Sequence, residues 1–180
     1  MYYDIIMTGF GGQGIQIISQ IVATASIRKG LEITFLPSYG VEKRGGRTNV
    51  TLVISDEEIG AFITNQPVSV IAMDTIGLDE FQDQIIPGGL LVVNTSLVPE
   101  KNITRNDINI LPVKCNDIAI EMGNARMANM IALGAFAGRI DFLDLSDLET
   151  AMQEVIPERL KHFIPDNLKA IKRGIELSSR

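Results

Sequence analysis

A chain of 180 residues, 46% of them hydrophobic, is long enough to bury its own core without disulfides or a structural metal. Its formal charge of −6 disfavours nonspecific nucleic-acid binding, which depends on basic patches that neutralise phosphates. No apolar run approaches the roughly 20 residues of a membrane span, and no basic region precedes an apolar signal segment. We therefore expect a cytoplasmic protein with a single domain, residues 1–180, that contacts no membrane.

Cysteine and histidine, which bind most redox metals and zinc, are scarce in this chain. Cys115 is the only cysteine, so the chain alone cannot form a disulfide, supply all the thiolates of an iron–sulfur cluster or build a cysteine-based zinc site. His162 is the only histidine, and we interpret it as a surface or packing residue. Any metal redox centre must therefore belong to another chain.

The first predicted element is a strand from Tyr3 to Thr8, and a glycine-rich turn and a helix follow it. The turn, Gly9-Phe10-Gly11-Gly12-Gln13-Gly14, has the spacing G-x-G-x-x-G between a strand and a helix. Glycines accept positive φ, and their missing side chains let an anion approach the N–H groups at a helix N-terminus. The same glycines would also serve a tight turn and close helix–sheet packing. The helix ends near Lys29-Gly30, and its predicted inward residues are Ile15, Ile18, Ile21, Val22 and Ala25.

Two further segments, Leu31 to Leu36 and Thr48 to Ile54, read as strands, the second rich in β-branched residues. Only Pro37 to Arg47 separates them, and this stretch has no helical periodicity. It is too short for the crossover that a parallel pair requires. We therefore predict that the two strands form an antiparallel pair within a mostly parallel sheet.

The rest of the chain alternates strands and helices. The predicted elements are strands at Val68 to Met73, Leu90 to Val93 and Ile108 to Val113, a short helix at Leu78 to Ile85, and buried helical segments between Ile118 and Phe136 that break at Gly123. Ser146 and Glu149 fit a capping box that opens a helix, and a last helix begins near Pro165-Asp166. In that last helix Leu168, Ile171 and Ile175 face inward, and Lys169, Lys172 and Arg173 face outward. This order predicts an α/β fold, a Rossmann-like three-layer sandwich.

A dinucleotide-binding Rossmann fold carries an acid at the end of its second strand, where it holds the ribose hydroxyls. Here Glu32 stands at the start of that strand, at the opposite edge of the sheet, which disfavours NAD. Arg44 or Arg47 leaves NADP open, because a cation suits the additional phosphate. In place of the acid comes the long segment from Pro37 to Arg47, which ends at the same edge as the glycine-rich turn.

This segment carries groups that suit an anionic ligand or an acidic partner surface. It offers an aromatic ring, cations and exposed backbone donors: Tyr39; Lys43, Arg44 and Arg47; and Gly45-Gly46. A simpler interpretation is that Glu42 pairs with Arg44 or Arg47 and holds the loop in shape. Surface pairs of this kind contribute only ~0–1 kcal/mol, so pairing alone does not explain so much charge in one loop.

Four stretches together resemble one known family. They are GFGGQGI at Gly9 to Ile15, PSYGVEKRGG at Pro37 to Gly46, ISDEEIG at Ile54 to Gly60 and NARMANMIALGAF at Asn124 to Phe136. They are similar to the gamma subunit, or gamma domain, of 2-oxoacid:ferredoxin oxidoreductases. The resemblance covers nearly the whole chain and is strongest for the 2-oxoglutarate and 2-ketoisovalerate types.

The resemblance implies a role inside a larger complex that converts a 2-oxoacid to acyl-CoA and reduces ferredoxin. Thiamine diphosphate, magnesium and 4Fe–4S clusters would lie on the partners, which are expected to be alpha, beta and delta subunits. This chain would contribute no catalytic residue and no metal ligand. Its glycine-rich turn and its loop from Pro37 to Arg47 would face the active-site region. Coenzyme A carries phosphates, so at the subunit interface it would suit both segments. The candidate binding residues are Gly9, Gly11, Gly12, Gln13, Gly14, Ser38, Tyr39, Gly40, Glu42, Arg44, Gly45, Gly46 and Arg47.

Two other interpretations stay open at the level of sequence. One is a free-standing NADP- or flavin-binding oxidoreductase, which needs a catalytic acid or base that no motif supplies. The other is an adaptor with a vestigial nucleotide fold, in which the glycine-rich turn serves packing alone. Produced without partners, the chain is expected to form a homodimer through surface meant for other subunits.

Overall fold

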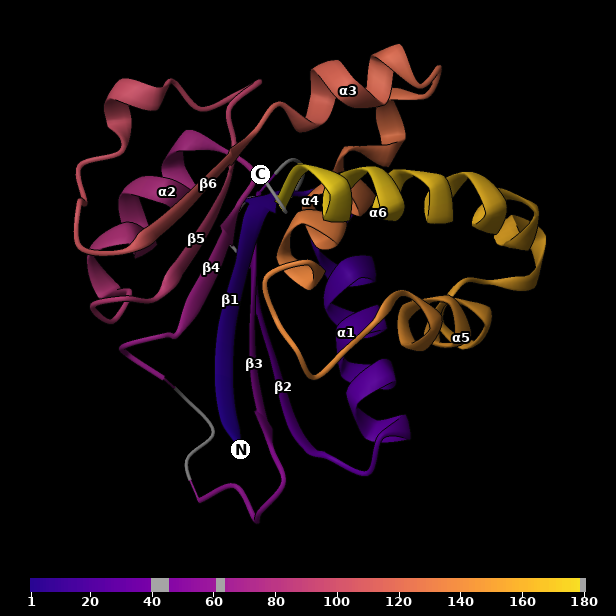
Figure 1. Cartoon of the computed structure of the whole chain (residues 1–180), viewed down its shortest axis with the longest axis horizontal. Coiled ribbons are helices and arrows are strands. Elements are labelled where there is room, and N and C mark those ends of the chain that lie inside the picture. Colours follow the sequence, from indigo (N-terminus) through magenta and orange to yellow (C-terminus); the bar gives the residue numbers. More distant parts are fainter. Residues whose placement is uncertain (40–45, 61–63, 179–180) are drawn as a thin grey trace.

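The computed structural model describes residues 1–39, 46–60 and 64–178. Its described residues form a six-stranded sheet with the order β2-β3-β1-β4-β5-β6 (Figure 1). The strands are β1 (Tyr2–Phe10), β2 (Glu32–Tyr39), β3 (Arg47–Ser55), β4 (Ser69–Ala72), β5 (Leu90–Asn94) and β6 (Asn109–Val113).

Strand directions bring the ends of β1 and β2 to one edge of the sheet. The neighbours β1, β4, β5 and β6 are parallel to each other. The predicted antiparallel pair of β2 and β3 is confirmed, and β3 is also antiparallel to β1. Since β3 lies between β1 and β2 and is antiparallel to both, β1 and β2 run in the same direction and end at the same edge of the sheet, toward the top of Figure 1.

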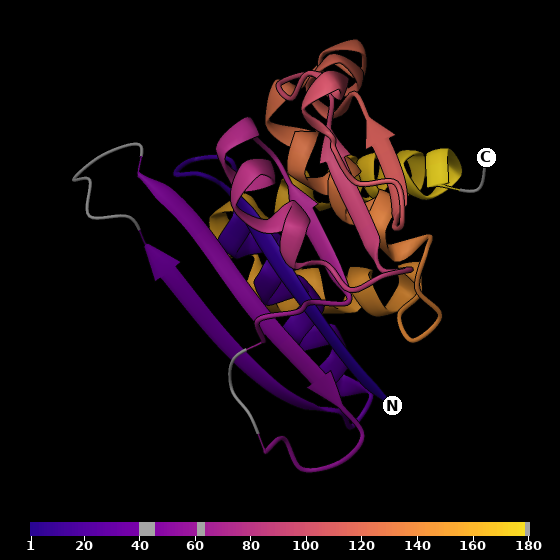
Figure 2. The same ribbon diagram turned by 90° about the vertical axis from the view of Figure 1, so that its left-hand side faces the viewer.

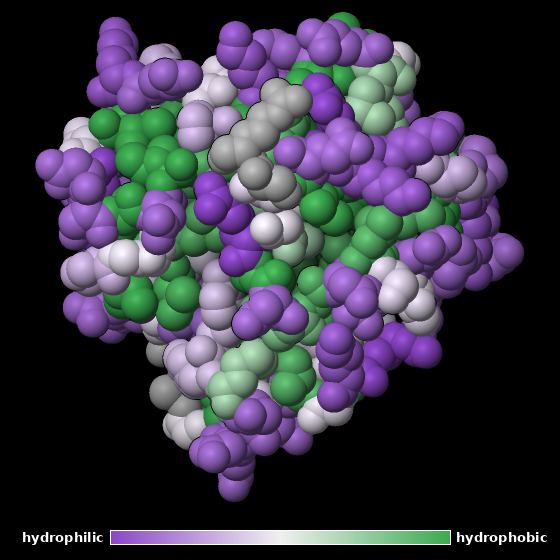
Figure 3. Space-filling model, viewed as in Figure 1, coloured by the Kyte–Doolittle hydropathy of each residue, from purple (hydrophilic) through white to green (hydrophobic). Residues whose placement is uncertain are grey.

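Helices cover both faces of the sheet, which confirms the predicted three-layer α/β sandwich. One face carries α1 (Ile15–Arg28), α4 (Ala128–Ala137), α5 (Leu145–Val155) and α6 (Ile164–Ser178), with α3 (Cys115–Glu121) beside α4. The other face carries α2 (Thr75–Phe81). The outward sides of α5 and α6 are mainly hydrophilic (Figure 3), as the outward Lys169 and Lys172 predict.

The main core lies between the sheet and the helices around α4, all ten residues of which are buried. Such a helix is apolar on every side because elements surround it completely. Glycines let α6 approach it closely. A Cβ on Gly174 would lie 2.2 Å from the Ile131 carbonyl oxygen, and one on Gly134 would lie 2.0 Å from that of Ile171. A smaller core fills the space under α2.

Some predicted helix starts are wrong. The helix expected from Leu78 begins at Thr75, because Asp74 Oδ1 caps it by accepting from Gly77 N at 2.7 Å. A 3-10 turn, Gln82–Gln84, follows its end. The capping box assigned to Ser146 is opened by Asp144 instead, since α5 begins one residue before Ser146.

Other boundaries agree closely with prediction. Gly123, with φ 88°, separates α3 from the 3-10 turn Ala125–Met127 that leads into α4, and the last helix begins at Ile164. Two more short 3-10 segments, Glu100–Asn102 and Glu158–Phe163, connect elements. No helix in the described ranges combines the length and apolarity that crossing a bilayer demands.

Candidate functional site

The glycine-rich turn lies at the carboxyl edge of the sheet, as predicted. Strand β1 runs two residues further than expected, so Gly9 and Phe10 belong to the strand, where they face Thr48 and Arg47 of β3. The added pairing with β3 extends the strand. The turn itself is therefore Gly11–Gly14, and Gly9 serves close packing, since a Cβ there would lie 2.5 Å from Gln13 Oε1.

Positive φ angles explain two of the glycines in this turn. Gly12 has φ 96° and Gly14 has φ 74°. Gly14 is the N-cap of α1, where no side chain caps the helix and the first turn holds no acidic residue. Gln13 Oε1 accepts a hydrogen bond from Phe10 N at 2.6 Å and holds the turn in shape. The start of α1 is therefore open to an anion, which a helix N-terminus attracts.

The hairpin loop is shorter than the predicted Pro37 to Arg47. Pro37, Ser38 and Tyr39 belong to β2, in register with Val50, Asn49 and Thr48 of β3. Proline is tolerated there because β2 is an edge strand, whose outer side needs no N–H donor. Ser38 is exposed. Four candidate residues, Gly40, Glu42, Arg44 and Gly45, lie in the segment 40–45, outside the described ranges. Tyr39 is described as part of β2, but its side chain is not described.

One backbone hydrogen bond and one ion pair connect the β2–β3 hairpin to the rest of this edge. Gly11 N donates to Gly46 O at 2.8 Å, which joins the glycine-rich turn to the hairpin. Arg47 forms an ion pair with Glu80 of α2, and both side chains are about a third exposed, at 33% and 38%. The sequence did not identify Glu80 as a partner. The cation of Arg47 is therefore already partly balanced by a carboxylate.

Arg126 and Asn129 complete this edge, and neither is among the binding residues predicted from the sequence. Asn129 Nδ2 donates to the Gly14 carbonyl at 3.3 Å, across 115 residues of chain. Asn124 Oδ1 accepts from Arg126 N at 3.1 Å and caps the 3-10 turn that presents the exposed Arg126 side chain. The stretch NARMANM contains Asn124, Arg126 and Asn129 and was the available signal, but no local spacing connects it to the turn.

Pockets lie beside the turn. One, of about 320 Å³, is lined by Gly12, Gln13, Gly14, Met73, Asn116, Ala125, Arg126, Ala128 and Asn129. Two of its lining residues, Met73 and Asn116, are held by Asn94, which is only 1% exposed: Asn94 Nδ2 donates to Met73 O and to Asn116 Oδ1, and its Oδ1 accepts from Cys115 N. A second pocket of about 550 Å³ shares Gly12, Arg126 and Asn129. Hydrogen bonds of Asn94, at the end of β5, thus hold the residues beside the turn in fixed positions.

The residues at this edge fit a phosphate better than a redox centre. Burial raises the pKa of the Cys115 thiol to about 12, so this sulfur is not available as a thiolate ligand. Within the described part of the chain, no cluster of His, Cys, Asp and Glu is arranged to hold a metal. His162 is exposed and its ring lies 4.0 Å from that of Phe163, in keeping with the predicted surface role.

Comparison with known proteins decides the family. Residues 4–177 match the family described as pyruvate ferredoxin/flavodoxin oxidoreductase. The chain belongs to this family. Its resemblance to gamma subunits is confirmed by a solved structure, the gamma subunit of a keto/oxoacid ferredoxin oxidoreductase from Geobacter sulfurreducens, at 26% identity and a TM-score of 0.82.

Relatives with known names include both predicted enzyme types. A ketoisovalerate oxidoreductase subunit, VorA of Methanothermobacter thermautotrophicus, is 29% identical over 94% of this chain, which spans only 35% of that relative. A 2-oxoglutarate synthase subunit, KorC of Methanocaldococcus jannaschii, is 28% identical over 99% of this chain and 95% of its own length. The family therefore contains this unit both as a separate chain and within a longer one.

A further solved structure agrees in fold. The 2-oxoglutarate:ferredoxin oxidoreductase of Magnetococcus marinus, solved with 2-oxoglutarate, coenzyme A and succinyl-CoA bound, superposes with a TM-score of 0.88 at 23% identity, over 99% of this chain and 31% of its own. At this identity the similarity establishes the fold alone.

Proposed function

We propose that this chain, as one gamma-type domain, is the gamma subunit of a 2-oxoacid:ferredoxin oxidoreductase in the cytoplasm. The complex would oxidatively decarboxylate a 2-oxoacid to acyl-CoA and pass the electrons to ferredoxin. The observation that carries this proposal is the end-to-end match to a separate gamma subunit, which covers 98% of both chains. A single cysteine leaves the iron–sulfur clusters to the alpha, beta and delta partners. The resemblance to the family places thiamine diphosphate and magnesium on those partners as well.

A surface for partner subunits is available on the β2–β3 hairpin. Strand β2 is at the edge of the sheet, so one side of its backbone has no neighbouring strand. Figure 2 shows that no helix lies over the α2 side of β2 and β3, whose ends at Tyr39 and Arg47 project beyond the helices. Leu36 on β2 is 42% exposed. We propose that partner subunits cover this surface, and that the isolated chain uses it to form a homodimer.

Coenzyme A would meet this chain at the carboxyl edge. Its phosphates suit the open N-terminus of α1 at Gly11–Gly14 and the cations of the hairpin, Arg44 and Arg47. The NADP- or flavin-binding alternative is less well supported, because Glu32 pairs with Ser55 at the opposite edge and leaves the end of β2 without an acid for a ribose.

Reconstitution tests the role of the chain as a subunit. Co-expression with the alpha, beta and delta subunits should yield a complex that reduces ferredoxin when given a 2-oxoacid and coenzyme A. The chain alone should show no turnover, and sedimentation should find it as a dimer. Turnover of any 2-oxoacid by the purified single chain would contradict the proposal.

Steady-state kinetics of the complex tests the contact with coenzyme A. Replacing Arg44 and Arg47 by alanine should raise the Michaelis constant for coenzyme A by roughly tenfold, the effect of losing one charged hydrogen bond. The control is Glu80→Gln, which removes the ion-pair partner of Arg47 but keeps both cations. An unchanged constant in the double alanine variant would remove these two residues from the site.

A further inference from the structure

Asn94 is a buried amide that connects the ends of neighbouring segments. It is the last residue of β5 and is only 1% exposed. Its Nδ2 donates to Met73 O at 3.3 Å and to Asn116 Oδ1 at 2.7 Å. Its Oδ1 accepts from Cys115 N at 3.1 Å and from Ser96 N at 3.3 Å. Both donors and both acceptor positions of this amide are therefore occupied within the protein.

The backbone around Asn94 decides which way its amide points. The N–H groups of Ser96 and Cys115 can only donate, so the atom of Asn94 that faces them must be the oxygen. The nitrogen of Asn94 then faces Met73 O, which can only accept. Because this nitrogen also donates to Asn116, the atom of Asn116 beside it must be the acceptor Oδ1. The direction of both amides thus follows from three backbone groups.

The amide nitrogen of Asn116 is consequently left for a ligand. Asn116 is partly buried and lines the pocket of about 320 Å³ beside the glycine-rich turn. Its oxygen is held by Asn94, whereas its Nδ2 donates to none of the described residues. The side chain therefore presents N–H donors to the pocket and no acceptor. Such a group binds a phosphate or carbonyl oxygen and offers nothing to an ammonium group.

The backbone that carries Asn116 is held by the same strand end. The N-cap residue of α3 supplies no side-chain hydrogen bond to the helix. Instead, Asn94 Oδ1 accepts from Cys115 N, and Ser96 Oγ accepts from Asp117 N at 3.1 Å. Both acceptors belong to the end of β5 and the turn after it. This strand end therefore fixes the position of Asn116 as well as the orientation of its amide.

We propose that Asn116 is a specificity-determining residue for the ligand at this edge, and that Asn94 is the positioning residue that directs its N–H groups. The inference rests on the proposed function, in which the ligand is coenzyme A, whose phosphate and carbonyl oxygens are acceptors. Asn94 does not contact the ligand, because its own hydrogen bonds are all internal. It acts by deciding which atom of Asn116 the ligand meets.

Steady-state kinetics of the reconstituted complex tests both roles. Asn116→Asp replaces the donor by an oxygen and keeps the acceptor for Asn94. It should raise the Michaelis constant for coenzyme A by about tenfold and leave that for the 2-oxoacid unchanged. Asn94→Asp keeps the acceptor for Cys115 N but cannot donate, so Asn116 turns its nitrogen toward residue 94 and its oxygen toward the pocket. This variant should also raise the constant for coenzyme A by about tenfold.

A double-mutant cycle separates positioning from a merely structural role. In an Asn116→Ala background, Asn94→Asp should change the Michaelis constant for coenzyme A by less than about twofold, because no amide is left to turn. A structural role would give the same increase in both backgrounds. The matched control is Asn109→Asp, which alters an exposed asparagine at the start of β6, the opposite edge of the sheet, and should leave the constant unchanged. Thermal unfolding checks that each variant is folded.

Two results would overturn the proposal alone. They are an unchanged Michaelis constant in Asn116→Asp, and an equal increase from Asn94→Asp with and without the Asn116 side chain, each in a complex that turns over. Asn116→Asp keeps the test decisive if Asn94→Asp is too unstable to assemble. A complex of the unaltered chain that shows no turnover would contradict the proposed function and this inference together, so the two failures are distinguishable.

Discussion

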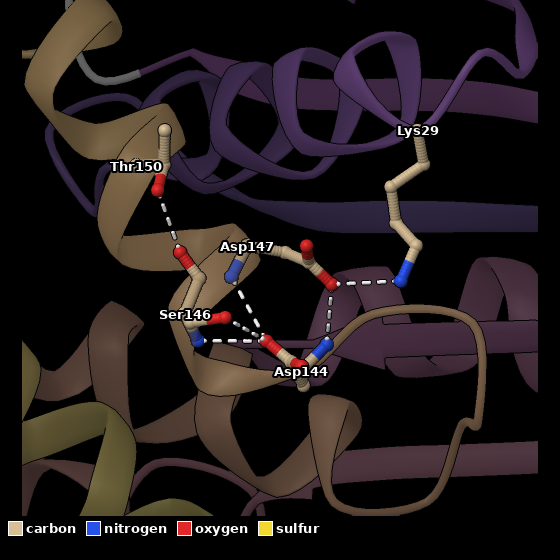
Figure 4. A network of polar contacts seen from close by, with 5 residues as sticks. All are labelled: Lys29, Asp144, Ser146, Asp147 and Thr150. Carbon is tan, nitrogen blue, oxygen red and sulfur yellow. Dashed lines mark hydrogen bonds and ion pairs between the residues drawn. The ribbon is translucent and has the colours of Figure 1, made fainter.

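Helices α1 and α5 pack side by side in one layer, yet their N-termini are built in opposite ways. At α5, Asp144 Oδ1 accepts from the N–H groups of Ser146 and Asp147 at 2.8 and 2.9 Å, and Asp147 accepts from Asp144 N at 2.9 Å (Figure 4). At α1, Gly14 provides no side chain. One start is closed by its own carboxylates, and the other is left for a group from outside the chain.

The C-terminal end of α1 is bound to α5 by two ion pairs, which hold the helix in place. Lys29 Nζ lies 3.0 Å from Asp147 Oδ2 (Figure 4), and Arg28 forms an ion pair with Glu154. The C-terminus of α1 is thus bound to the capped start of α5. The comparison teaches that the C-terminus of α1 is connected to α5 by ion pairs, whereas its N-terminus is left open to a ligand.

The largest expected effect comes from breaking the open end itself. Gly14→Ala should destabilise the protein by about 2–4 kcal/mol in urea unfolding, because alanine resists φ 74° and its Cβ would lie 2.3 Å from Asn129 Nδ2. Gly12→Ala is the control, since φ 96° is equally unfavourable there but the Cβ meets nothing. It should cost only about 1–2 kcal/mol. Equal costs would mean that the contact with Asn129 contributes nothing.

Removing the cap at the closed end should have a smaller effect. Asp144→Ala deprives the N–H groups of Ser146 and Asp147 of their acceptor and should lower the melting temperature by roughly 2–4 °C. Asp144→Asn should retain most of the melting temperature, because asparagine caps about as well as aspartate. An Asp144→Asn melting temperature as low as that of Asp144→Ala would contradict the role of this side chain as the helix cap.

Local pattern was enough to predict much of the fold. The apolar residues of α1 predicted to face inward are all buried, and the break at Gly123 and the antiparallel β2–β3 pair are as expected. The errors have non-local causes. The sequence does not reveal that β2 is an edge strand, which is what lets it continue through Pro37. Asp144 and Ser146 are both good N-cap residues, so periodicity alone did not choose between them.

The candidate site was predicted in its location but not in its members. Glycine spacing placed the turn at the carboxyl edge, since that motif is local. The contact of Asn129 with Gly14 and the pairing of Arg47 with Glu80 join segments far apart in the chain, and only tertiary packing brings them together. Arg126 also lies more than a hundred residues from the turn in the sequence, so only the fold brings it to this edge.

Acid titration should sharpen the comparison further. Hydrogen bonds from the N–H of Asp147 and from Ser146 lower the pKa of Asp144 below its usual 3.8. A lowered pKa means that the charge of Asp144 stabilises the folded state above about pH 4 and that this contribution is lost as the pH falls through the folded pKa. The difference in melting temperature between the unaltered chain and Asp144→Asn should therefore shrink below about pH 4. A difference that grows in acid would contradict this assignment.

The smallest expected effect lies at the anchor between the two helices. Lys29→Gln should lower the free energy of unfolding by no more than about 0.5 kcal/mol, because the Lys29 side chain is 41% exposed and water screens its pair with Asp147. The loss should vanish in about 1 M salt. Arg28→Gln, which breaks the neighbouring pair with Glu154, serves as the matched comparison. A cost above about 1 kcal/mol that persists in salt would mean that the anchor holds α1 through more than a surface ion pair.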